Sequence, residues 1–395
     1  MVTCEARHMN GIDVPLPVAD LDVLRQRRSA KWRGYPADVL PLPVAEMDFD
    51  LAPAVQDVLL EAVRRSDVGY AGPPSDVADA LAGFAQTRWG WTIDPARVRL
   101  ATDVGVACVE MLRVLCRPGD GVVISPPVYP PFFHWLEESG VTRIDAPLRQ
   151  TADGAWRLDF DTLAAAFARR PVAYVLCHPQ NPVGRVHTAD ELAEVVRLAQ
   201  EYGVRVIADE IHAPLVLPGA TYTPFLTIPG AAEIGVSLQS ASKAWNLAGL
   251  KCATIVSASP TMTAEVEQRP ADARWRIGHL GALATVAAYT DGVDWLDALL
   301  GTLDLRRRQL GDLIAERLPD VAWTPPEATF LAWLDCRRIG TGDRPQRLFL
   351  ERGEVALEPG PNFGPPGEGW VRLNYGTSAE ILDEGVRRMA SALGD

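Results

Sequence analysis

The chain has 395 residues, of which 48% are apolar, 23% charged and 7% aromatic. This composition is ordinary for a globular protein, excludes a collagen-like, coiled-coil or largely disordered chain, and provides a core that needs no disulfide or metal. The net charge of −13 repels phosphate backbones, so we expect no nucleic-acid partner.

Residues 1–50 are irregular in pattern, with several prolines and a basic patch at 25–33. We expect them to form an arm that packs with a small C-terminal domain. From residue 51 the apolar residues recur every three or four positions, which predicts a helix.

A regular alternation of short apolar runs and amphipathic stretches follows. The predicted strands are 122–125, 172–176, 204–208 and 235–238, and the predicted helices include 104–115, 132–138, 158–168 and 190–201. Alternation of this kind predicts an α/β domain with a mainly parallel sheet. Because the runs are apolar throughout, we expect both faces of the sheet to be covered. We assign residues 51–290 to this large domain.

After about residue 290 the pattern changes. A long helix at 293–317 leads to a strand-like stretch at 321–335, and the chain ends in a glycine- and proline-rich loop, a strand and a helix. Residues 291–395 are therefore predicted to form a smaller α+β domain.

The number and spacing of the cysteines and lysines limit the kinds of site that the chain can form. The six cysteines are scattered without a C-x-x-C pair, so we expect neither a zinc site nor disulfides but reduced thiols in the cytoplasm. No signal peptide and no membrane-spanning stretch is expected. The chain has three lysines, Lys31, Lys243 and Lys251, so chemistry that depends on lysine has three candidates.

Four short motifs follow predicted strands of the large domain, where ligands of parallel sheets bind. They are PPVYPPF at 126–132, NPVG at 181–184, ADEIH at 208–212 and SASK at 240–243. Each alone has a structural explanation: a packed tyrosine, a turn opener, a strand exit to solvent and a helix cap. Together, in the order Tyr, Asn, Asp, Lys, they indicate one site.

That set of side chains matches the needs of pyridoxal 5′-phosphate (PLP). A lysine forms a Schiff base with its aldehyde, an Asp pairs with its pyridine nitrogen, and an aromatic ring stacks on its plane. Serine hydroxyls and N–H groups at a helix start hold a phosphate.

With these motifs the chain resembles the fold type I PLP enzymes of the class I/II aminotransferase superfamily, from about residue 31 to the end. Within it, the chain is most similar to the MalY/PatB-type cystathionine β-lyase, or C–S lyase, branch. The similarity rests on Lys31-Trp32, on LPLPVAEMDF at 40–49 and on Gly69-Tyr70. It also rests on NLAGL at 246–250, GPNFG at 360–364 and VRLN at 371–374.

The resemblance implies a role for each matching residue. Lys243 would be the Schiff-base lysine and the base that moves the Cα proton. The other cofactor contacts would be Asp209 to the pyridine nitrogen, Asn181 to the ring hydroxyl, Tyr129 on the ring, and Ser240, Ser242 and the N–H groups of Val104 and Gly105 on the phosphate. His212 also matches the branch, as a catalytic or as a structural histidine.

Two further roles concern substrate and assembly. Arg372 would grip the substrate α-carboxylate bidentately, a geometry that Arg supplies and Lys does not. Tyr70 would be a catalytic residue that reaches the substrate and the cofactor phosphate of the other subunit, which implies a homodimer with shared active sites. Lys251 would serve as a point charge for the phosphate or lie on the surface.

The leading functional hypothesis is β-elimination from cystathionine or an L-cysteine S-conjugate, giving a thiol, pyruvate and ammonia. An aminotransferase is the second hypothesis, since it uses the same residues, and a decarboxylating or oxidative PLP enzyme of secondary metabolism is the third. A PLP-fold transcriptional regulator is disfavoured, because about 50 irregular residues leave no room for a winged-helix domain. A non-catalytic partner role alongside catalysis stays open.

Overall fold

The computed structural model describes residues 15–394, apart from the side chain of Arg274. Cys4 and residues 1–14 of the predicted arm lie outside the described residues. Within 15–50, where an irregular arm was expected, the structure has two one-turn helices, α1 (Leu21–Leu24) and α2 (Ala30–Arg33), and a short strand, β1 (Leu40–Pro41).

A seven-stranded sheet forms the centre of the larger part of the molecule. In spatial order its strands are β2 (Val98–Ala101), β10 (Ala253–Val256), β9 (Gly235–Gln239), β8 (Arg205–Asp209), β7 (Ala173–Cys177), β3 (Gly121–Ile124) and β4 (Thr142–Asp145). The strands from β4 to β9 pair in parallel, whereas β10 is antiparallel to both of its neighbours. The prediction of a mainly parallel sheet is confirmed.

The central strands β7 and β9 are buried along their whole length, as expected for strands covered on both faces, although β9 includes the polar residues Ser237 and Gln239. The strands that the pattern did not reveal are β2, β4 and β10. Each has four residues, and β2 and β4 carry arginines that interrupt the apolar run. β2 and β4 are short edge strands of mixed polarity, which leave too little periodicity to be recognised, and β10 is an interior strand of only four residues.

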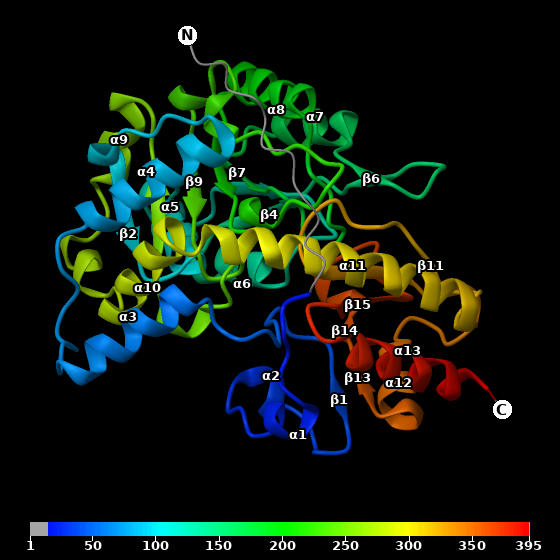
Figure 1. Cartoon of the computed structure of the whole chain (residues 1–395). Helices are drawn as coiled ribbons and strands as arrows, with labels where there is room; N and C mark the ends of the chain where they lie inside the picture. The colour runs from blue at the N-terminus through cyan, green and yellow to red at the C-terminus, as the bar shows by residue number, and fades with distance from the viewer. Residues whose placement is uncertain (1–14, 395) are drawn as a thin grey trace, which may run out of the picture.

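Helices cover the sheet and connect its strands (Figure 1). They are α3 (Pro53–Arg64), α4 (Ser75–Trp89), α5 (Val104–Leu115), α6 (Pro131–Glu138), α7 (Phe160–Ala168), α8 (Ala189–Tyr202), α9 (Pro260–Val266) and α10 (His279–Thr290). The Asp103 carboxylate caps α5 by accepting from the Val106 N–H at 2.8 Å. Thr188 and Glu191 form a capping box at the start of α8.

A second sheet lies in the C-terminal part of the chain. Its strands, in order, are β11 (Ala322–Trp323), β12 (Leu331–Asp335), β15 (Trp370–Asn374) and β14 (Glu358–Pro359), all antiparallel. The helices of this part are α11 (Val293–Arg317), α12 (Gln346–Gly353) and α13 (Ala379–Leu393). The strand-like stretch at 321–335 is thus two short strands separated by a turn.

The N-terminal elements lie beside the C-terminal ones rather than beside the large sheet (Figure 1). Strand β1 pairs in parallel with β13 (Val355–Ala356), with Leu40 opposite Val355. A small hairpin of β5 (Arg149–Gln150) and β6 (Trp156–Arg157) also extends from the large sheet. We propose that residues 51–290 and 291–395 are two domains, since each of these parts has its own sheet, and that residues 1–50 form a separate N-terminal arm.

No helix of the described residues is long and apolar enough to cross a membrane. Five of the six cysteines, namely Cys108, Cys116, Cys177, Cys252 and Cys336, lie within the described residues, and all five are buried and form no disulfide with one another.

Candidate active site

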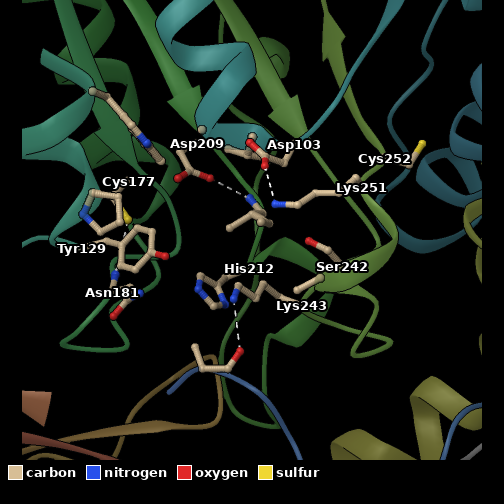
Figure 2. Close-up of a pocket in the computed structure, with 17 residues that line it drawn as sticks. Asp103, Tyr129, Cys177, Asn181, Asp209, His212, Ser242, Lys243, Lys251 and Cys252 are labelled. Atoms are coloured by element: carbon tan, nitrogen blue, oxygen red, sulfur yellow. Dashed lines mark hydrogen bonds and ion pairs between the residues drawn. The ribbon is translucent and has the colours of Figure 1, made fainter. Parts of the chain in front are cut away.

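A cavity of about 270 Å³ lies where three central strands end and helix α5 begins (Figure 2). Side chains reach it from β7, from β8 and from the turn after β9, as expected for a ligand site at the carboxyl edge of a parallel sheet. Its predicted lining residues are Val104, Gly105, Tyr129, Asn181, Asp209, His212, Ser242, Lys243 and Lys251.

Asp209 is the last residue of β8, opposite Cys177 of β7 and Leu238 of β9. Its Oδ1 accepts a hydrogen bond from the Ile211 N–H at 3.1 Å. Burial raises the pKa of Asp209 to about 7, although that N–H and the charge of Lys243 act in the opposite direction. A carboxyl with this environment is suited to a cationic partner in the cavity.

Lys243 lies on the turn that follows β9, and its Nζ donates to the Ala45 carbonyl at 3.1 Å. Burial lowers the pKa of Lys243 to about 8, with the charge of Arg372 as the second cause. A substantial fraction of the amine is therefore neutral near pH 8, as a nucleophile or base requires.

The two serines of the SASK motif differ in position. Ser242 lines the cavity, whereas Ser240 does not. The Ser240 hydroxyl donates to the Cys252 carbonyl at 2.7 Å and accepts from the Ser242 N–H at 3.1 Å. Since these bonds occupy it, we propose that Ser240 shapes the turn that carries Lys243, rather than contacting the phosphate.

The start of α5 forms one end of the cavity. The first N–H groups of a helix have no partner within the helix, so those of Val104 and Gly105 suit an anion. Lys251 adds a positive charge there and pairs with Asp103 at 2.8 Å (Figure 2). Gly105 allows this helix to lie close to Trp135, because a Cβ at position 105 would meet the indole Nε1 at 2.8 Å.

Tyr129 and Asn181 lie on the opposite side of the cavity from Ser242 (Figure 2). Burial raises the pKa of Tyr129, so its phenol stays neutral. The Asn181 side chain is 3% exposed, and its backbone N–H donates to the Cys177 sulfur at 3.4 Å.

Arg372, on β15, is brought to this region through Asn181. Its Nη1 donates to the Asn181 Oδ1 at 3.1 Å, and its Nη2 donates to the Pro43 carbonyl at 2.8 Å. The guanidinium lies over the Phe363 ring, with Cζ 5.0 Å from the ring centroid. Its buried Nε has no hydrogen-bond partner among the described residues, which leaves a donor for a ligand carboxylate.

His212 lines the cavity as a neutral imidazole. Burial, followed by the charges of Lys243 and Arg372, lowers its pKa to about 3. Its Nδ1 is buried without a partner among residues 15–394. A ligand oxygen or nitrogen near this atom would satisfy it.

Tyr70 lies outside the cavity of its own chain. Its side chain is 80% exposed, and its ring contacts that of Trp275 edge-on at 5.8 Å between centroids. The expected action of Tyr70 on the site of another subunit stays a prediction.

Sequence reasoning missed several lining residues, among them Ala45, Trp135 and Cys177. Cys177 stands at the end of a predicted strand, so its strand position could have revealed it. Ala45 lies in the LPLPVAEMDF motif at 40–49, so that motif could have revealed it. Trp135 carries no motif signal, and only the fold brings it to the cavity.

Comparison with known protein families adds an independent finding. Residues 37–389 match the model of the family described as aminotransferase class I and II. The chain belongs to this family. The match covers both sheets of the structure, so the class I/II aminotransferase fold accounts for nearly the whole chain.

Individual members of the class I/II family are similar over most of their length. Cystathionine β-lyase PatB of Bacillus subtilis is 36% identical over 90% of this chain and 93% of its own. Cystathionine β-lyase of Corynebacterium glutamicum is 33% identical over 95% and 99%. The solved structure of cystalysin from Treponema denticola, which contains PLP, superposes with a TM-score of 0.89 at 27% identity over 93% and 96% of the two chains.

The cavity fits PLP on its own chemistry. Asp209 supplies a buried carboxyl that forms no ion pair within residues 15–394, and Lys243 supplies an amine of lowered pKa. The α5 N-terminus and Lys251 supply an anion site at the other end, and Tyr129 supplies a ring at the side. The donor set therefore suits a flat cofactor with one phosphate and one basic ring nitrogen.

Proposed function

We propose that this chain is a PLP-dependent carbon–sulfur β-lyase that cleaves cystathionine or an L-cysteine S-conjugate into a thiol, pyruvate and ammonia. The observation that carries the proposal is Lys243, a buried amine of lowered pKa that shares one cavity with Asp209 and feels the charge of Arg372. The relatives named cystathionine β-lyase support the choice of this reaction.

The residues divide the work as follows. When bound, PLP supplies an aldehyde for the substrate amine and a ring that accepts the electron pair left on Cα. Asp209 holds a proton on the ring nitrogen, which makes the ring a better electron acceptor. Arg372 holds the substrate α-carboxylate through donors such as its unpartnered Nε. Asn181 fixes the direction of the guanidinium.

Lys243 moves the proton. With a pKa of about 8, its neutral form can take the proton from the substrate Cα at neutral pH. Departure of the thiolate from Cβ then breaks the carbon–sulfur bond, and hydrolysis of the remaining three-carbon fragment gives pyruvate and ammonia. His212 is neutral throughout this pH range and therefore adds no charge to the site.

Product analysis tests the proposal. The PLP-loaded protein is incubated with L-cystathionine and with S-alkyl cysteines, each with and without a 2-oxo acid, and the products are identified by mass. We expect thiol, pyruvate and ammonia without any oxo acid. Release of carbon dioxide together with ammonia would instead indicate the decarboxylating reaction.

An aminotransferase is the second candidate, because the family model that matches the chain is the one described for aminotransferases. Lys243, Asp209 and Arg372 would serve transamination equally well, since both reactions begin with loss of the Cα proton. The need for a 2-oxo acid separates the two.

We also propose that the protein acts as a homodimer with shared sites, in the cytoplasm. Support for a dimer comes from exposed apolar side chains, namely Leu60 and Val63 of α3, Val68 and Tyr70 of the following loop, and Trp275, whose ring contacts that of Tyr70. Large apolar side chains left exposed on one chain are often covered in a protein–protein interface.

A further inference from the structure

The segment 43–48 crosses one side of the site, and all five carbonyl groups from 43 to 47 accept hydrogen bonds from side chains of distant segments. Arg372 Nη2 donates to the Pro43 carbonyl at 2.8 Å, and Lys243 Nζ donates to that of Ala45 at 3.1 Å. Asn374 Nδ2 donates to two carbonyls, those of Val44 at 2.7 Å and Glu46 at 2.6 Å. Lys31 Nζ also donates to Glu46, at 3.3 Å, and Asn246 Nδ2 donates to Met47 at 2.9 Å. An irregular segment is thus held by side chains rather than by a β-sheet.

Two of these donors, Arg372 and Lys243, belong to the proposed reaction. The other three, Lys31, Asn246 and Asn374, have no part in it. Asn374 is fully buried, and its Oδ1 also accepts from the Gly376 N–H at 2.8 Å, which fixes the direction of its amide. All three lie in sequence matches that the proposed mechanism leaves unexplained.

The Asn246 side chain binds both backbone groups of Met47, the N–H and the carbonyl. Its Oδ1 accepts from the Met47 N–H and its Nδ2 donates to the Met47 carbonyl, both at 2.9 Å. The backbone of Asn246 has φ +59°, a conformation that Asn adopts more readily than most residues. Because Asn246 lies three residues after Lys243, it ties the lysine-bearing turn directly to the segment.

Lys31 reaches the segment as half of a buried ion pair. Its Nζ lies 2.7 Å from the Asp48 Oδ2, and the two side chains are 1% and 0% exposed. The Trp32 indole donates to the other Asp48 oxygen at 3.0 Å. Since a buried ion pair adds little net stability compared with apolar packing, its presence here points to a role in placing the backbone.

We propose that Lys31, Asn246 and Asn374 are positioning residues that hold segment 43–48 as a fixed wall of the substrate pocket. The wall keeps Ala45 on the cavity lining and directs the Pro43 carbonyl at the Arg372 guanidinium. The guanidinium is then aimed by two acceptors, Asn181 on one nitrogen and Pro43 on another. This inference rests on the proposed function of Arg372 as the carboxylate-binding residue.

The wall predicts a specific kinetic defect. In Asn374→Ala and Asn246→Ala, segment 43–48 loses hydrogen-bond donors. The Arg372 guanidinium is then less well oriented, so the substrate carboxylate binds more weakly. We expect KM to rise roughly 10- to 100-fold, the range that a displacement of about 1 Å causes, while kcat changes less and PLP content stays that of the wild type. Amide hydrogen exchange in a peptide covering 43–49 should become faster in both variants.

Gln309→Ala is the matched control. The Gln309 Nε2 also donates to a main-chain carbonyl, that of Ala379, at 3.0 Å, but in the C-terminal part of the chain. It should leave KM and the exchange of 43–49 unchanged. Because Lys31→Met alone leaves the Asp48 charge buried and unpaired, the pair is tested as the double variant Lys31→Met/Asp48→Asn, which should also raise KM.

Unchanged KM and unchanged exchange at 43–49 in all three variants would overturn the proposal. It would also be overturned if PLP content and kcat both fell as KM rose, since the residues would then support the cofactor or the whole fold. Hydrogen exchange is measured on PLP-loaded protein without substrate. If the wild type lacked lyase activity while 43–49 still loosened in the variants, the wall would stand and the proposed reaction would fail.

Discussion

Arg372 donates a hydrogen bond to the Oδ1 of Asn181 at 3.1 Å, although 191 positions separate the two residues in the chain. Asn181 follows β7 of the large sheet, and Arg372 lies on β15 of the C-terminal sheet. The bond therefore joins the two sheets at the site. The bond also fixes the positions of two site residues relative to each other: Arg372, which is proposed to bind the substrate carboxylate, and Asn181, which is proposed to contact the cofactor ring.

Removal of Lys243 should abolish covalent attachment of PLP. We expect Lys243→Ala to retain PLP only loosely and to lose turnover by roughly 10²- to 10⁴-fold or more, because it lacks both the attachment point and the base. The check is borohydride reduction followed by peptide mass analysis. Lys251→Ala is the control and should still be labelled at Lys243. A label on Lys31 or Lys251 in the wild type would refute the assignment.

The attachment of PLP to the apoprotein should depend on pH. The pKa of Lys243 is lowered to about 8 by burial, so the neutral amine becomes the major form only above that pH. The rate of covalent attachment, followed by absorbance, should rise with pH and be half-maximal near 8. Arg372→Met removes the second cause of the lowering and should move the midpoint upward. A midpoint above 10 in the wild type would contradict the environment described for this lysine.

Asp209 should make the apoprotein less stable as the pH rises. Burial raises its folded-state pKa from 3.8 to about 7, so its contribution to stability is fully present below about 4 and is lost as the pH rises through 7. We expect Asp209→Asn to avoid this loss, which is at most about 4 kcal/mol. Urea midpoints of both apoproteins at pH 4 and pH 8 measure it. Parallel behaviour of the two proteins would show that Asp209 is not desolvated.

Substrate binding should depend on the guanidinium rather than on positive charge alone. Arg372→Lys keeps the charge but loses the planar donor fork and the contacts to Asn181 and Pro43. We expect kcat/KM to fall roughly 10- to 100-fold, mainly through KM, with PLP retained. Steady-state kinetics and the PLP spectrum provide the test. A variant as active as the wild type would place the carboxylate elsewhere.

Tyr70 should act across a dimer interface, because it is 80% exposed and lies outside the cavity of its own chain. Inactive Tyr70→Ala and Lys243→Ala proteins, mixed under conditions of verified subunit exchange, should regain up to one intact site per hybrid dimer. Mixing Lys243→Ala with Asp209→Ala is the control and should restore nothing, since both residues come from one chain. Absence of recovery in the first mixture would show that Tyr70 does not complete the site of another subunit.

The site residues that could be predicted from the sequence are those that directly follow a predicted strand of the large sheet. Asp209 and Lys243 follow runs whose pattern was clear, and the helix predicted at 104–115 has those bounds in the structure. The contact of Arg372 with Asn181 was not predictable, since it depends on how two separate sheets pack. The bonds of Ser240 were hidden for a related reason, because its partner Cys252 lies beyond a turn with no periodic signal.

The conformation of segment 43–48 could not be predicted from the sequence for the same reason. Its residues matched a motif, but its conformation depends on donors from positions 31, 243, 246, 372 and 374. Local propensity carries no information on such bonds, because they are formed only after distant segments have packed.

The ratio of pyruvate to thiol released from S-methyl-L-cysteine, with no 2-oxo acid present, tests the central claim most directly. Lys243→Ala serves as the blank. We predict one pyruvate and one ammonia for each thiol, over many turnovers. Turnover that starts only when a 2-oxo acid is added, and that converts this acid into its amino acid, would contradict the β-lyase and establish an aminotransferase.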